Sequence, residues 1–271
     1  MLPLSKQNAY RERYKTLRPG WRASGEAFEA LTRQYIGPGT RVLDLGCGRG
    51  GVMELFWREV KLPVGLDPDH ASLVEHRARV AASTLSGTHT ERSEVGVKSK
   101  GAAPEMPLVC GLGDDLPFPA ESFDLVIGLW VLEHLAQPEI VLSEIRRVLR
   151  SPGPAPGAPG GHFIFLTPNA LHPLIRLNRL SQLLPALQRR LIPRLYARAE
   201  ADTFRVHYRA NTPSRLRALA AAHGFRVASL RAIPDPTYLA FNDLFFRMSV
   251  LFERLLPEGW GVHVIGDLAK A

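Results

Sequence analysis

The sequence predicts a doubly wound α/β fold, in which helices cover both faces of a mainly parallel sheet. From residue 24 to residue 167, apolar runs of strand length alternate with segments of helical periodicity, and this alternation is typical of βαβ units. A chain of 271 residues that is 45% hydrophobic is long enough to bury the core of one large domain. The third observation is VLDLGCGRGG at 42–51, an apolar strand that runs directly into a glycine-rich turn.

The first βαβ unit is expected to follow an N-terminal helical region. We expect a helix over 24–36 and a first strand over Arg41 to Leu45. A helix from about Gly50 to Val60 should come next, because its apolar positions fit one buried face. The second strand, Leu62 to Leu66, then ends at Asp67.

The same alternation continues to a fifth strand. A helix over about 70–82 precedes residues 83–107, which contain almost no large apolar side chains, and we expect this insert to be disordered. Residues 151–161 are rich in proline and glycine and should form a loop. The other elements expected in this half are a helix over about 138–150 and strands at 108–110, 123–129 and 162–167.

The alternation stops after Pro168. Residues 171–205 have helical periodicity, are rich in leucine and arginine, and are interrupted by three prolines, so we expect a helical cap over 168–211. The pattern then resumes with a helix over 212–223 that ends at Gly224, a strand over 225–230, an amphipathic helix over about 238–256 and a last strand near 262–265.

Composition narrows the class of protein. No apolar run approaches the roughly 18 residues of a membrane helix, and the N-terminus lacks the apolar core of a signal peptide, so we expect a cytoplasmic protein. The two cysteines, Cys47 and Cys110, lack CxxC spacing, so we expect neither a disulfide framework nor a metal site. The net charge of +8 would suit nucleic acid or an anionic membrane. Because the arginines are scattered over the whole chain, we favour a role in solubility.

The glycine-rich turn predicts a nucleotide-type ligand. Glycines let the backbone come close to a ligand, and the start of the next helix offers free amide hydrogens. The spacing fits two classes of site, because Gly46, Gly48 and Gly51 satisfy the dinucleotide pattern GxGxxG. Asp44 with Gly46, Gly48 and Gly50 satisfies the acidic DxGxG pattern of methyl-donor sites instead. The spacing by itself does not choose between them.

Two carboxylates flank this turn. Asp67 lies 21 residues after Gly46, where a carboxylate can accept hydrogen bonds from both hydroxyls of a ribose. The alternative for Asp67 is a plain turn residue before Pro68. Asp44 lies inside an apolar strand, where an unpaired charge is costly, so it needs a partner. Either an ammonium group of the ligand or the backbone amides of the turn would serve.

These features converge on one edge of the predicted sheet. The glycine turn, Asp67, the segment Asp114-Asp115 and the segment Trp130 to His134 follow the first four strands in order. In open parallel sheets, ligands bind beyond the carboxyl ends of the strands. The convergence therefore predicts the ligand site more specifically than any single motif.

Four motifs, in order and spacing, resemble the class I S-adenosylmethionine-dependent methyltransferases. The closest likeness is to the small-molecule branch that includes quinone-biosynthesis enzymes. The resemblance implies a Rossmann-like sheet of seven strands, with the seventh antiparallel and inserted beside the sixth, and S-adenosyl-L-methionine as cofactor. The motifs are VLDLGCGRGG at 42–51, VGLDPD at 64–69, DDLPFPAESFDLVIGLWVLEHL at 114–135 and EIVLSEIRRVLRSPG at 139–153.

The resemblance also implies roles for individual residues around the cofactor. The glycine turn would cradle the methionine part, with Asp44 near its amino group, and Asp67 would hold the ribose. Relatives often carry an acidic residue near the adenine where this chain has Leu112, so Asp114 or the backbone around Gly113 would make that contact. The full set of implied cofactor-binding residues is Asp44, Gly46, Cys47, Gly48, Gly50, Asp67, Pro68, Gly113, Asp114, Leu129, Trp130 and, from an N-terminal lid, Tyr14.

Methyl transfer requires alignment of the nucleophile with the methyl group, and a general base only when the acceptor is a neutral hydroxyl. The catalytic candidates are His134, which follows the fourth strand, and His207 with Tyr208, in the segment that returns from the cap. For His134 a packing role is slightly favoured. Trp130 would either border the sulfonium and the acceptor or belong to the core.

The leading functional hypothesis is methyl transfer to the oxygen or carbon of a small acceptor, with apolar and lipid-like compounds as candidates. The alternatives are a nicotinamide-dependent oxidoreductase and a non-catalytic methyltransferase-like binding protein. The Leu- and Arg-rich cap either contacts an anionic membrane or packs on the core or on a second subunit, and no specific nucleic acid is expected. The chain is expected to form one domain, with a helical lid over 1–36, a cofactor-binding core over 37–167, the cap over 168–211 and the end of the sheet over 212–271.

Overall fold

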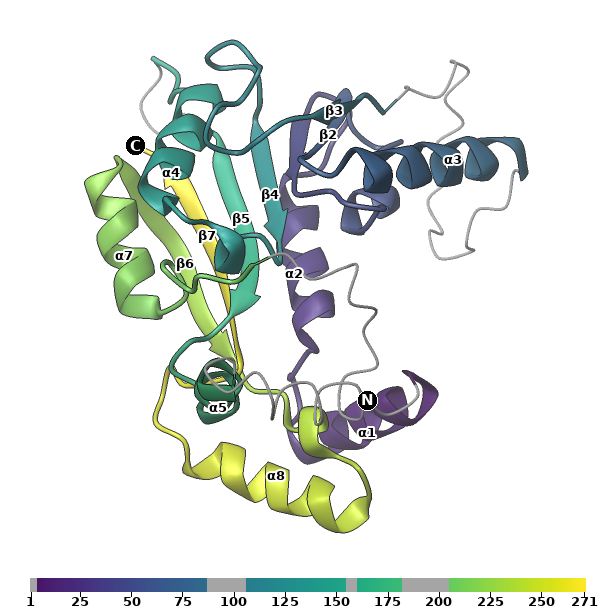
Figure 1. Cartoon of the computed structure of the whole chain (residues 1–271), viewed down its shortest axis with the longest axis vertical. Helices are drawn as coiled ribbons and strands as arrows, with labels where there is room; N and C mark the ends of the chain where they lie inside the picture. The colour runs from purple at the N-terminus through teal and green to yellow at the C-terminus, as the bar shows by residue number, and fades with distance from the viewer. Residues whose placement is uncertain (1–3, 87–105, 155–159, 182–204) are drawn as a thin grey trace.

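A computed structural model describes residues 4–86, 106–154, 160–181 and 205–271. Its centre is one sheet of seven strands in the order β3-β2-β1-β4-β5-β7-β6 (Figure 1). Strand β7 pairs antiparallel with both β5 and β6, and all other neighbours are parallel. The strands are β1 Arg41–Leu45, β2 Leu62–Asp67, β3 Leu108–Cys110, β4 Leu125–Leu129, β5 His162–Pro168, β6 Phe225–Ile233 and β7 His263–Lys270. The predicted fold class is confirmed, including the antiparallel seventh strand beside the sixth.

Helices cover both faces of this sheet because the strands are apolar on both sides. On one face, Leu43 of β1 and Phe163 of β5 belong to a core cluster that also holds apolar residues of α4 and α7. On the other face, Val42 and Ile164 pack in a cluster with Phe28 of α2. The helices are α1 Leu4–Leu17, α2 Ser24–Thr32, α3 His70–Ser86, α4 Pro138–Val148, α5 Pro173–Ser181, α7 Pro213–Ala222 and α8 Asp243–Leu255.

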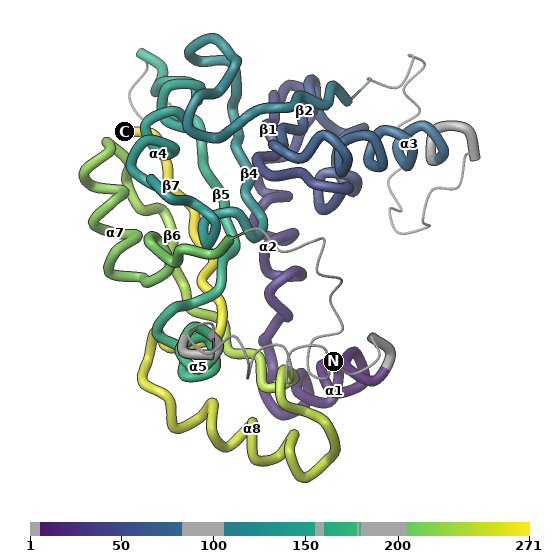
Figure 2. Tube along the Cα trace, viewed as in Figure 1, coloured from purple at the N-terminus to yellow at the C-terminus, as the bar shows by residue number. Residues whose placement is uncertain are grey.

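Three helices lie beyond the carboxyl ends of the parallel strands. Figure 1 shows α1, α5 and α8 at the end of the molecule toward which the arrows of β4, β5 and β6 point. The two ends of the chain lie far apart, with α1 at this end and the last residues of β7 at the other (Figure 2). A third cluster joins α1 to α8 through Tyr14, Trp21, Phe246 and Val250. The strand order reverses between β1 and β4, so this end of the sheet also contains the crevice where ligands of doubly wound folds bind.

The predicted helix from Gly50 to Val60 is wrong. The structure has only a short 3₁₀ helix, Val52–Leu55, whose i→i+3 hydrogen bonds include Phe56 N to Met53 O at 2.9 Å. The apolar side chains of Met53 and Phe56 are still buried. Two consecutive glycines open the segment, and glycine loses more conformational entropy in a helix than any other residue, so burial is achieved without a full α-helix.

Other helices and strands form as predicted but begin or end at different residues. Asn242 caps α8, since its Oδ1 accepts a hydrogen bond from Phe245 N at 3.0 Å, so that helix begins later than predicted. A separate 3₁₀ turn, Pro236–Leu239, precedes it. Strand β4 begins at Leu125, and Phe123 makes only an isolated bridge to Leu149. Most of the predicted insert 83–107 and much of the cap 168–211 lie outside the described residues, and α5 is the described helix of the cap.

No helix in the described ranges combines the length and apolar character that crossing a membrane requires.

Candidate functional site

The glycine turn after β1 is tied to β2 by its own backbone. The amides of Gly46 and Cys47 both donate to Leu66 O, at 2.7 and 3.1 Å. Gly46 has φ +74°, and a Cβ there would overlap the side chain of Val131. Gly50 has φ +109°, and a Cβ there would overlap the carboxylate of Glu54. At both positions the left-handed backbone favours glycine, and at Gly46 the Val131 side chain also leaves no space for a Cβ.

Asp67, the last residue of β2, holds the turn through side-chain hydrogen bonds. Its Oδ2 accepts a hydrogen bond from Gly48 N at 2.8 Å, and its Oδ1 accepts one from Asp69 N at 2.8 Å. The side chain is buried. A carboxylate offers about four lone-pair sites, so each oxygen can accept a second donor. Asp67 is therefore both a brace for the glycine turn and an acceptor with free capacity for a pair of hydroxyls.

Asp44 is the fourth of the five residues of β1, next to the turn, and is 3% exposed. Burial, together with the nearby carboxylates of Asp67 and Glu54, raises the pKa of this carboxyl to about 7. Among the described residues, no hydrogen bond to the Asp44 side chain is found. Asp44 is thus a buried acid whose ionised form lacks compensation within the protein.

The backbone of the turn is not the partner of Asp44. The amides of Gly46 and Cys47 donate to Leu66 O, that of Gly48 donates to Asp67, and that of Gly50 donates to Cys47 O at 3.0 Å. None of these four amides therefore donates to Asp44. A cationic group of the ligand stays the other predicted partner of this carboxyl.

The loop after β3 lies against Asp67. Cys110 pairs with Asp67 across the sheet, and Gly111 N donates to Asp67 O at 3.2 Å. The next residue, Leu112, is an exposed apolar side chain (58%), and Asp114 is exposed as well. Gly113 packs closely, since a Cβ there would lie 3.4 Å from both Leu45 and Val141. The loop therefore offers a flat ring an apolar contact at Leu112 and a polar one at Asp114.

Two implied cofactor residues have side chains that face elsewhere. Cys47 is buried, and its Sγ points at Gly65 of β2, where a Cβ would come within 2.8 Å of the sulfur. Burial also raises the pKa of the Cys47 thiol. Pro68 is exposed, and its carbonyl accepts a hydrogen bond from Cys110 Sγ at 3.6 Å. Cys47 can therefore contribute to a ligand site through its backbone only.

Trp130 follows Leu129 at the carboxyl end of β4. Its backbone is left-handed, with φ +61°, which is uncommon for a bulky residue and typical of constrained positions. Trp130 is partly exposed, and its ring stands edge-on against His263 with the ring centroids 4.8 Å apart. The ring therefore packs against His263 without belonging to the buried core, and its predicted contact with the sulfonium and the acceptor stays a prediction.

His263 is a buried residue that the sequence analysis missed. Its Nδ1 lies 2.6 Å from Ser24 Oγ, and its Nε2 lies 2.8 Å from the hydroxyl of Tyr238. Burial lowers the pKa of His263 to about 3, so the ring is neutral. Because β7 runs antiparallel, its first residue lies at the carboxyl edge of the other strands. The implied antiparallel last strand was the signal that could have placed His263 at this edge.

The three catalytic candidates are brought together. Glu133 O accepts hydrogen bonds from His207 N at 2.7 Å and from Tyr208 N at 3.1 Å. His134 Nδ1 lies 3.1 Å from Arg205 O. Tyr208 has a left-handed backbone, with φ +52°. The segment after β4 and the segment that returns from the cap therefore form one unit, and a backbone bond holds the His134 ring within it.

A buried network of hydrogen-bonded polar side chains supports this unit. The sequence analysis missed this network as well. The Glu133 carboxylate accepts a hydrogen bond from Thr167 Oγ1 at 3.0 Å, and Asn211 Nδ2 donates to Thr167 Oγ1 at 2.5 Å. The three side chains come from the ends of β4 and β5 and from the residues just before α7. Their burial leaves them to position the backbone at the edge. The glutamate inside the quoted motif WVLEHL was the available signal.

Tyr14 and Arg13 of the N-terminal helix contact α8 and its neighbours. Tyr14 is buried edge-on against Trp21, with ring centroids 4.8 Å apart, and its hydroxyl accepts a hydrogen bond from Arg18 at 3.5 Å. Arg13 pairs with Asp243 at 3.1 Å and lies over the ring of Phe246. The helix is docked against α8, and the implied contact of Tyr14 with the cofactor stays a prediction.

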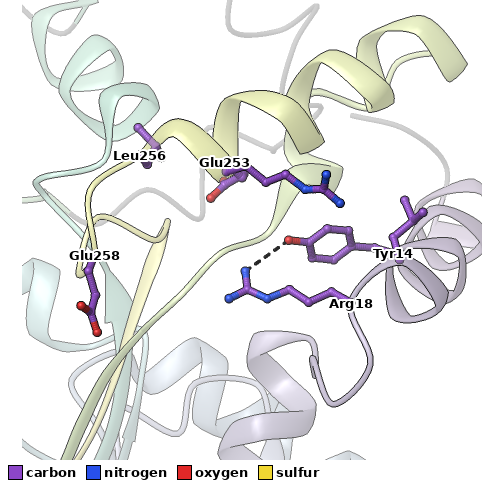
Figure 3. Close-up of a pocket in the computed structure, with 7 residues that line it drawn as sticks. Tyr14, Arg18, Glu253, Leu256 and Glu258 are labelled. Carbon is purple, nitrogen blue, oxygen red and sulfur yellow. Dashed lines mark hydrogen bonds between the residues drawn. The ribbon is translucent and has the colours of Figure 1, made fainter.

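A pocket of about 550 Å³ opens between α1 and the end of α8 (Figure 3). Its volume is in the range of small-molecule sites. Figure 3 shows Arg18 reaching the Tyr14 hydroxyl on one side and the carboxylates of Glu253 and Glu258 on the other. Leu17, Arg254 and Leu256 complete the lining. The pocket thus offers both charges together with apolar surface.

Comparison with known proteins shows which protein family part of this chain resembles. Residues 43–155 match the family model of the methyltransferase domain. The demethylmenaquinone methyltransferase of Symbiobacterium thermophilum is 32% identical over 141 residues, which are 51% of this chain and 46% of that protein. The ubiquinone biosynthesis O-methyltransferase of Rhizobium etli is 29% identical over 115 residues, 42% of this chain and 39% of that protein. The matches span less than half of the length of these two relatives.

A solved structure extends the likeness in fold over nearly the whole chain. It is geranyl diphosphate C-methyltransferase of Streptomyces coelicolor A3(2), in complex with Mg²⁺, geranyl diphosphate and S-adenosyl-L-homocysteine. The TM-score is 0.56 at 14% identity, and the match covers 91% of this chain and 78% of the other. Residues 43–155 therefore match the methyltransferase domain family, and the chain is similar in sequence to S-adenosylmethionine-dependent methyltransferases, those of quinone biosynthesis among them, and in fold to a solved C-methyltransferase.

Proposed function

We propose that this protein transfers a methyl group from S-adenosylmethionine to the oxygen or carbon of a small acceptor. The observation that carries the proposal is Asp44, a buried carboxyl with a raised pKa and no described hydrogen-bond partner beneath the glycine turn. The methionine part of the donor carries an ammonium group that would compensate this acid. The nicotinamide alternative offers Asp44 no such group, and the family match also favours the methyl donor.

The residues around Asp44 fit the rest of the donor. Asp67 has acceptor capacity left for the two ribose hydroxyls, and the loop at Leu112 to Asp114 would meet the adenine. When bound, S-adenosylmethionine supplies a methyl group that is already activated by its sulfonium. The protein then has to hold the donor and the acceptor in line and to exclude water.

The acceptor would enter from the side of α1, α5 and α8. Trp130 presents a partly open ring at the end of β4, and the unit formed by His134, His207 and Tyr208 adjoins it along the chain. We propose that the Trp130 ring borders the sulfonium and the acceptor. His134 donates its Nδ1–H to Arg205 O, which leaves the Nε2 lone pair to take a proton from an acceptor hydroxyl, and His207 and Tyr208 are the other candidates for this role.

Several names among the relatives suggest an apolar class of acceptor, although the sarcosine/dimethylglycine N-methyltransferase of Halorhodospira halochloris is named for a polar one. Two of them act in quinone biosynthesis by name, a third is a sterol 24-C-methyltransferase of Gibberella zeae, and the solved complex contains geranyl diphosphate. The quinone, sterol and geranyl names denote prenyl-derived or otherwise lipid-like chemistry. We therefore propose a small acceptor with an apolar or lipid-like part.

Donor binding tests the cofactor assignment. Titration calorimetry of the full chain with S-adenosylhomocysteine should show binding, and Asp67→Ala should abolish it. Asp115→Ala is the control, because Asp115 is an exposed carboxylate after β3 that is not among the residues expected to bind the donor, so the affinity should be unchanged. Equal affinity of wild type and Asp67→Ala, or thermal stabilisation by a nicotinamide dinucleotide and none by the donor, would overturn the assignment.

Transfer itself needs a separate measurement, because a [4+2]-cyclase shares this fold with a TM-score of 0.51. Label from the methyl group of the donor should enter one of the quinone, phenol, fatty-acid or sugar fractions of a cell extract. Label in the fatty-acid or quinone fraction supports the apolar acceptor, and label in the sugar fraction contradicts it. Donor binding without label in any fraction would indicate a non-catalytic binding protein.

A further inference from the structure

Helix α8 presents a continuous apolar surface to solvent. Six of its large apolar side chains are between 37% and 75% exposed, and they are Leu244, Phe245, Met248, Leu251, Phe252 and Leu255. We call these six residues the α8 stripe. Phe241, in the turn before the helix, is exposed as well. Isolated exposed apolar residues are ordinary, but contiguous patches on one element mark interaction surfaces.

The α8 stripe occupies one side of a helix whose opposite side is anchored. At 100° per residue, the six positions cover a sector roughly 120° wide. The other side carries Phe246 and Val250, which are buried in the cluster shared with Tyr14 and Trp21 of the N-terminal region. The helix is thus held to the protein by one apolar face while a second apolar face is turned outward.

Arginines border the stripe on one side. Arg247 and Arg254 are seven residues apart, so they lie almost in line along the edge of the stripe, and both are exposed. Within the described residues, neither forms an ion pair. The exposed acid at the start of the helix, Asp243, is already engaged by Arg13 at 3.1 Å and by the Tyr10 hydroxyl at 3.1 Å. The border of the stripe is therefore cationic, with Asp243 as the acid near Arg247.

Helix α5 continues this arrangement beside α8. His172, just before α5, lies 3.3 Å from Glu253 of α8 through its Nε2. On α5 itself, Leu177, Arg176 and Arg179 are exposed, although the Arg176 guanidinium lies over the Trp260 ring and that of Arg179 over the Tyr208 ring. An exposed leucine and exposed arginines thus occur on α5 as well as on α8, at the same end of the molecule (Figure 1).

We propose that the α8 stripe docks on an anionic lipid surface, with the six apolar side chains in the interfacial region and the arginines at the lipid headgroups. An apolar sector bordered by cations is the pattern of helices that lie in a membrane interface. Charge separates this partner from a second copy of the chain, because the edge of the stripe carries arginines and no free acid to pair with them. The net charge of +8 acts in the same direction.

The α8 stripe lies beside the pocket between α1 and α8, so docking would affect how molecules reach this pocket. Arg254, at the edge of the stripe, and Leu256, one residue beyond it, line the 550 Å³ pocket between α1 and α8. A protein seated on the stripe would hold this pocket beside the lipid. The docking proposal does not depend on the proposed methyl transfer, since it concerns only the outer surface of α8.

Vesicle co-sedimentation tests the proposal with the full chain. Phosphatidylcholine vesicles with 30% phosphatidylglycerol, an amount on the order of that in anionic membranes, should bind wild type. Pure phosphatidylcholine should bind at least about tenfold less, and 0.5 M salt should weaken binding to the anionic vesicles. The double variant Leu251→Ser with Leu255→Ser should lose about tenfold or more in partition coefficient, because two inserted side chains are removed.

Matched control variants distinguish binding through the α8 stripe from non-specific binding through other exposed residues. Val74→Ser with Ile140→Ser removes two comparably exposed apolar residues from α3 and α4 and should leave vesicle binding unchanged. Arg247→Gln should weaken binding to anionic vesicles several-fold, whereas Arg217→Gln, an exposed arginine on α7, should not. Thermal unfolding checks that all variants are folded, which is expected because every altered side chain is at the surface.

The results distinguish a lipid surface from a second copy of the chain as the partner of the stripe. Loss of vesicle binding in the stripe variant, with binding retained in the control, supports the proposal. Absence of binding to anionic vesicles, or equal binding of the stripe variant and wild type, overturns it. If sedimentation velocity shows a wild-type dimer that the stripe variant converts to a monomer, and vesicles do not bind, the stripe is an interface between two copies and the lipid proposal is wrong.

Discussion

The carboxylate of Asp67 accepts a hydrogen bond from the amide of Gly48 at 2.8 Å, and this bond joins the end of β2 to the turn that follows β1. The two strands are already paired residue by residue, from Arg41 with Leu62 to Leu45 with Leu66. The extra bond extends the pairing past the end of the sheet. A side chain expected to hold a ribose therefore also shapes the turn expected to hold the methionine, so the two halves of the donor site are built together.

Donor affinity should depend on the ionisation of Asp44. Its pKa of about 7 means that the carboxyl is neutral below this pH and attracts an ammonium group only above it. Between pH 5.5 and 7, we expect the affinity of wild type for S-adenosylhomocysteine to rise by up to about tenfold per unit. Over this range the amino group of the ligand stays protonated, since α-amino groups titrate near 7.7–8.0.

Asp44→Asn is the matched variant for this effect. It should bind the product more weakly than wild type at pH 7.5 and should show no comparable rise in affinity between pH 5.5 and 7. Calorimetric titrations at four pH values measure both slopes. If the variant keeps the slope of wild type, Asp44 does not contact the ammonium group.

The same carboxyl should lower the stability of the unliganded protein at neutral pH. The folded pKa of Asp44, about 7, lies above the ordinary value of 3.8, so the folded state holds a proton that the unfolded state has released. The stabilising contribution is complete below pH 3.8 and is lost as the pH rises through about 7, an upper limit of about 4 kcal/mol. Asp44→Asn should therefore be more stable than wild type in urea unfolding at pH 8. A stability difference between the two proteins that does not grow from pH 5 to pH 8 would contradict this account.

His263 should act on stability in the opposite direction. Its folded pKa of about 3 lies below the ordinary value of 6.5, because burial disfavours the charged ring. Below pH 6.5 the unfolded state binds a proton that the folded state does not, so stability falls as the pH falls from 6.5 toward 3.

His263→Gln tests this effect. The variant retains polar atoms for Ser24 and Tyr238 but does not titrate. It should be less stable than wild type at pH 7, by about 1–3 kcal/mol for imperfect hydrogen bonds, and the difference should shrink at pH 5. Urea unfolding at both pH values measures this. A penalty that is equal at pH 5 and pH 7 would show that the ring titrates normally.

Gly46→Ala should damage the donor site. The residue has φ +74°, and its new methyl group would overlap Val131. We expect a loss of about 1–3 kcal/mol in unfolding free energy, together with at least tenfold weaker binding of the product. Gly39→Ala is the control, because a Cβ at Gly39 meets nothing within 4 Å and its φ is not positive. Equal product affinity in the two variants would show that the turn tolerates a side chain.

Much of the framework was predictable because it rests on local pattern. The strand Arg41–Leu45 was predicted to the residue, since a run of apolar residues followed by glycines has few other structures available. The helix that ends before Gly224 follows in the same way, because Gly224 at φ +68° ends it and Thr212 caps its start. The helix predicted from about Gly50 to Val60 does not form, because a 3₁₀ helix already buries Met53 and Phe56.

The sequence by itself determined the order of strands and helices, the glycine turn and the positions of Asp44 and Asp67, because each depends on residues close together in the chain. Only the tertiary structure decided that the turn amides donate elsewhere and leave Asp44 without them, that His263 supports Trp130, and that α8 turns a second apolar face outward. These three facts depend on contacts, or on the absence of contacts, between segments far apart in sequence. Periodicity shows that a residue belongs to an apolar face, but only packing shows whether that face is covered.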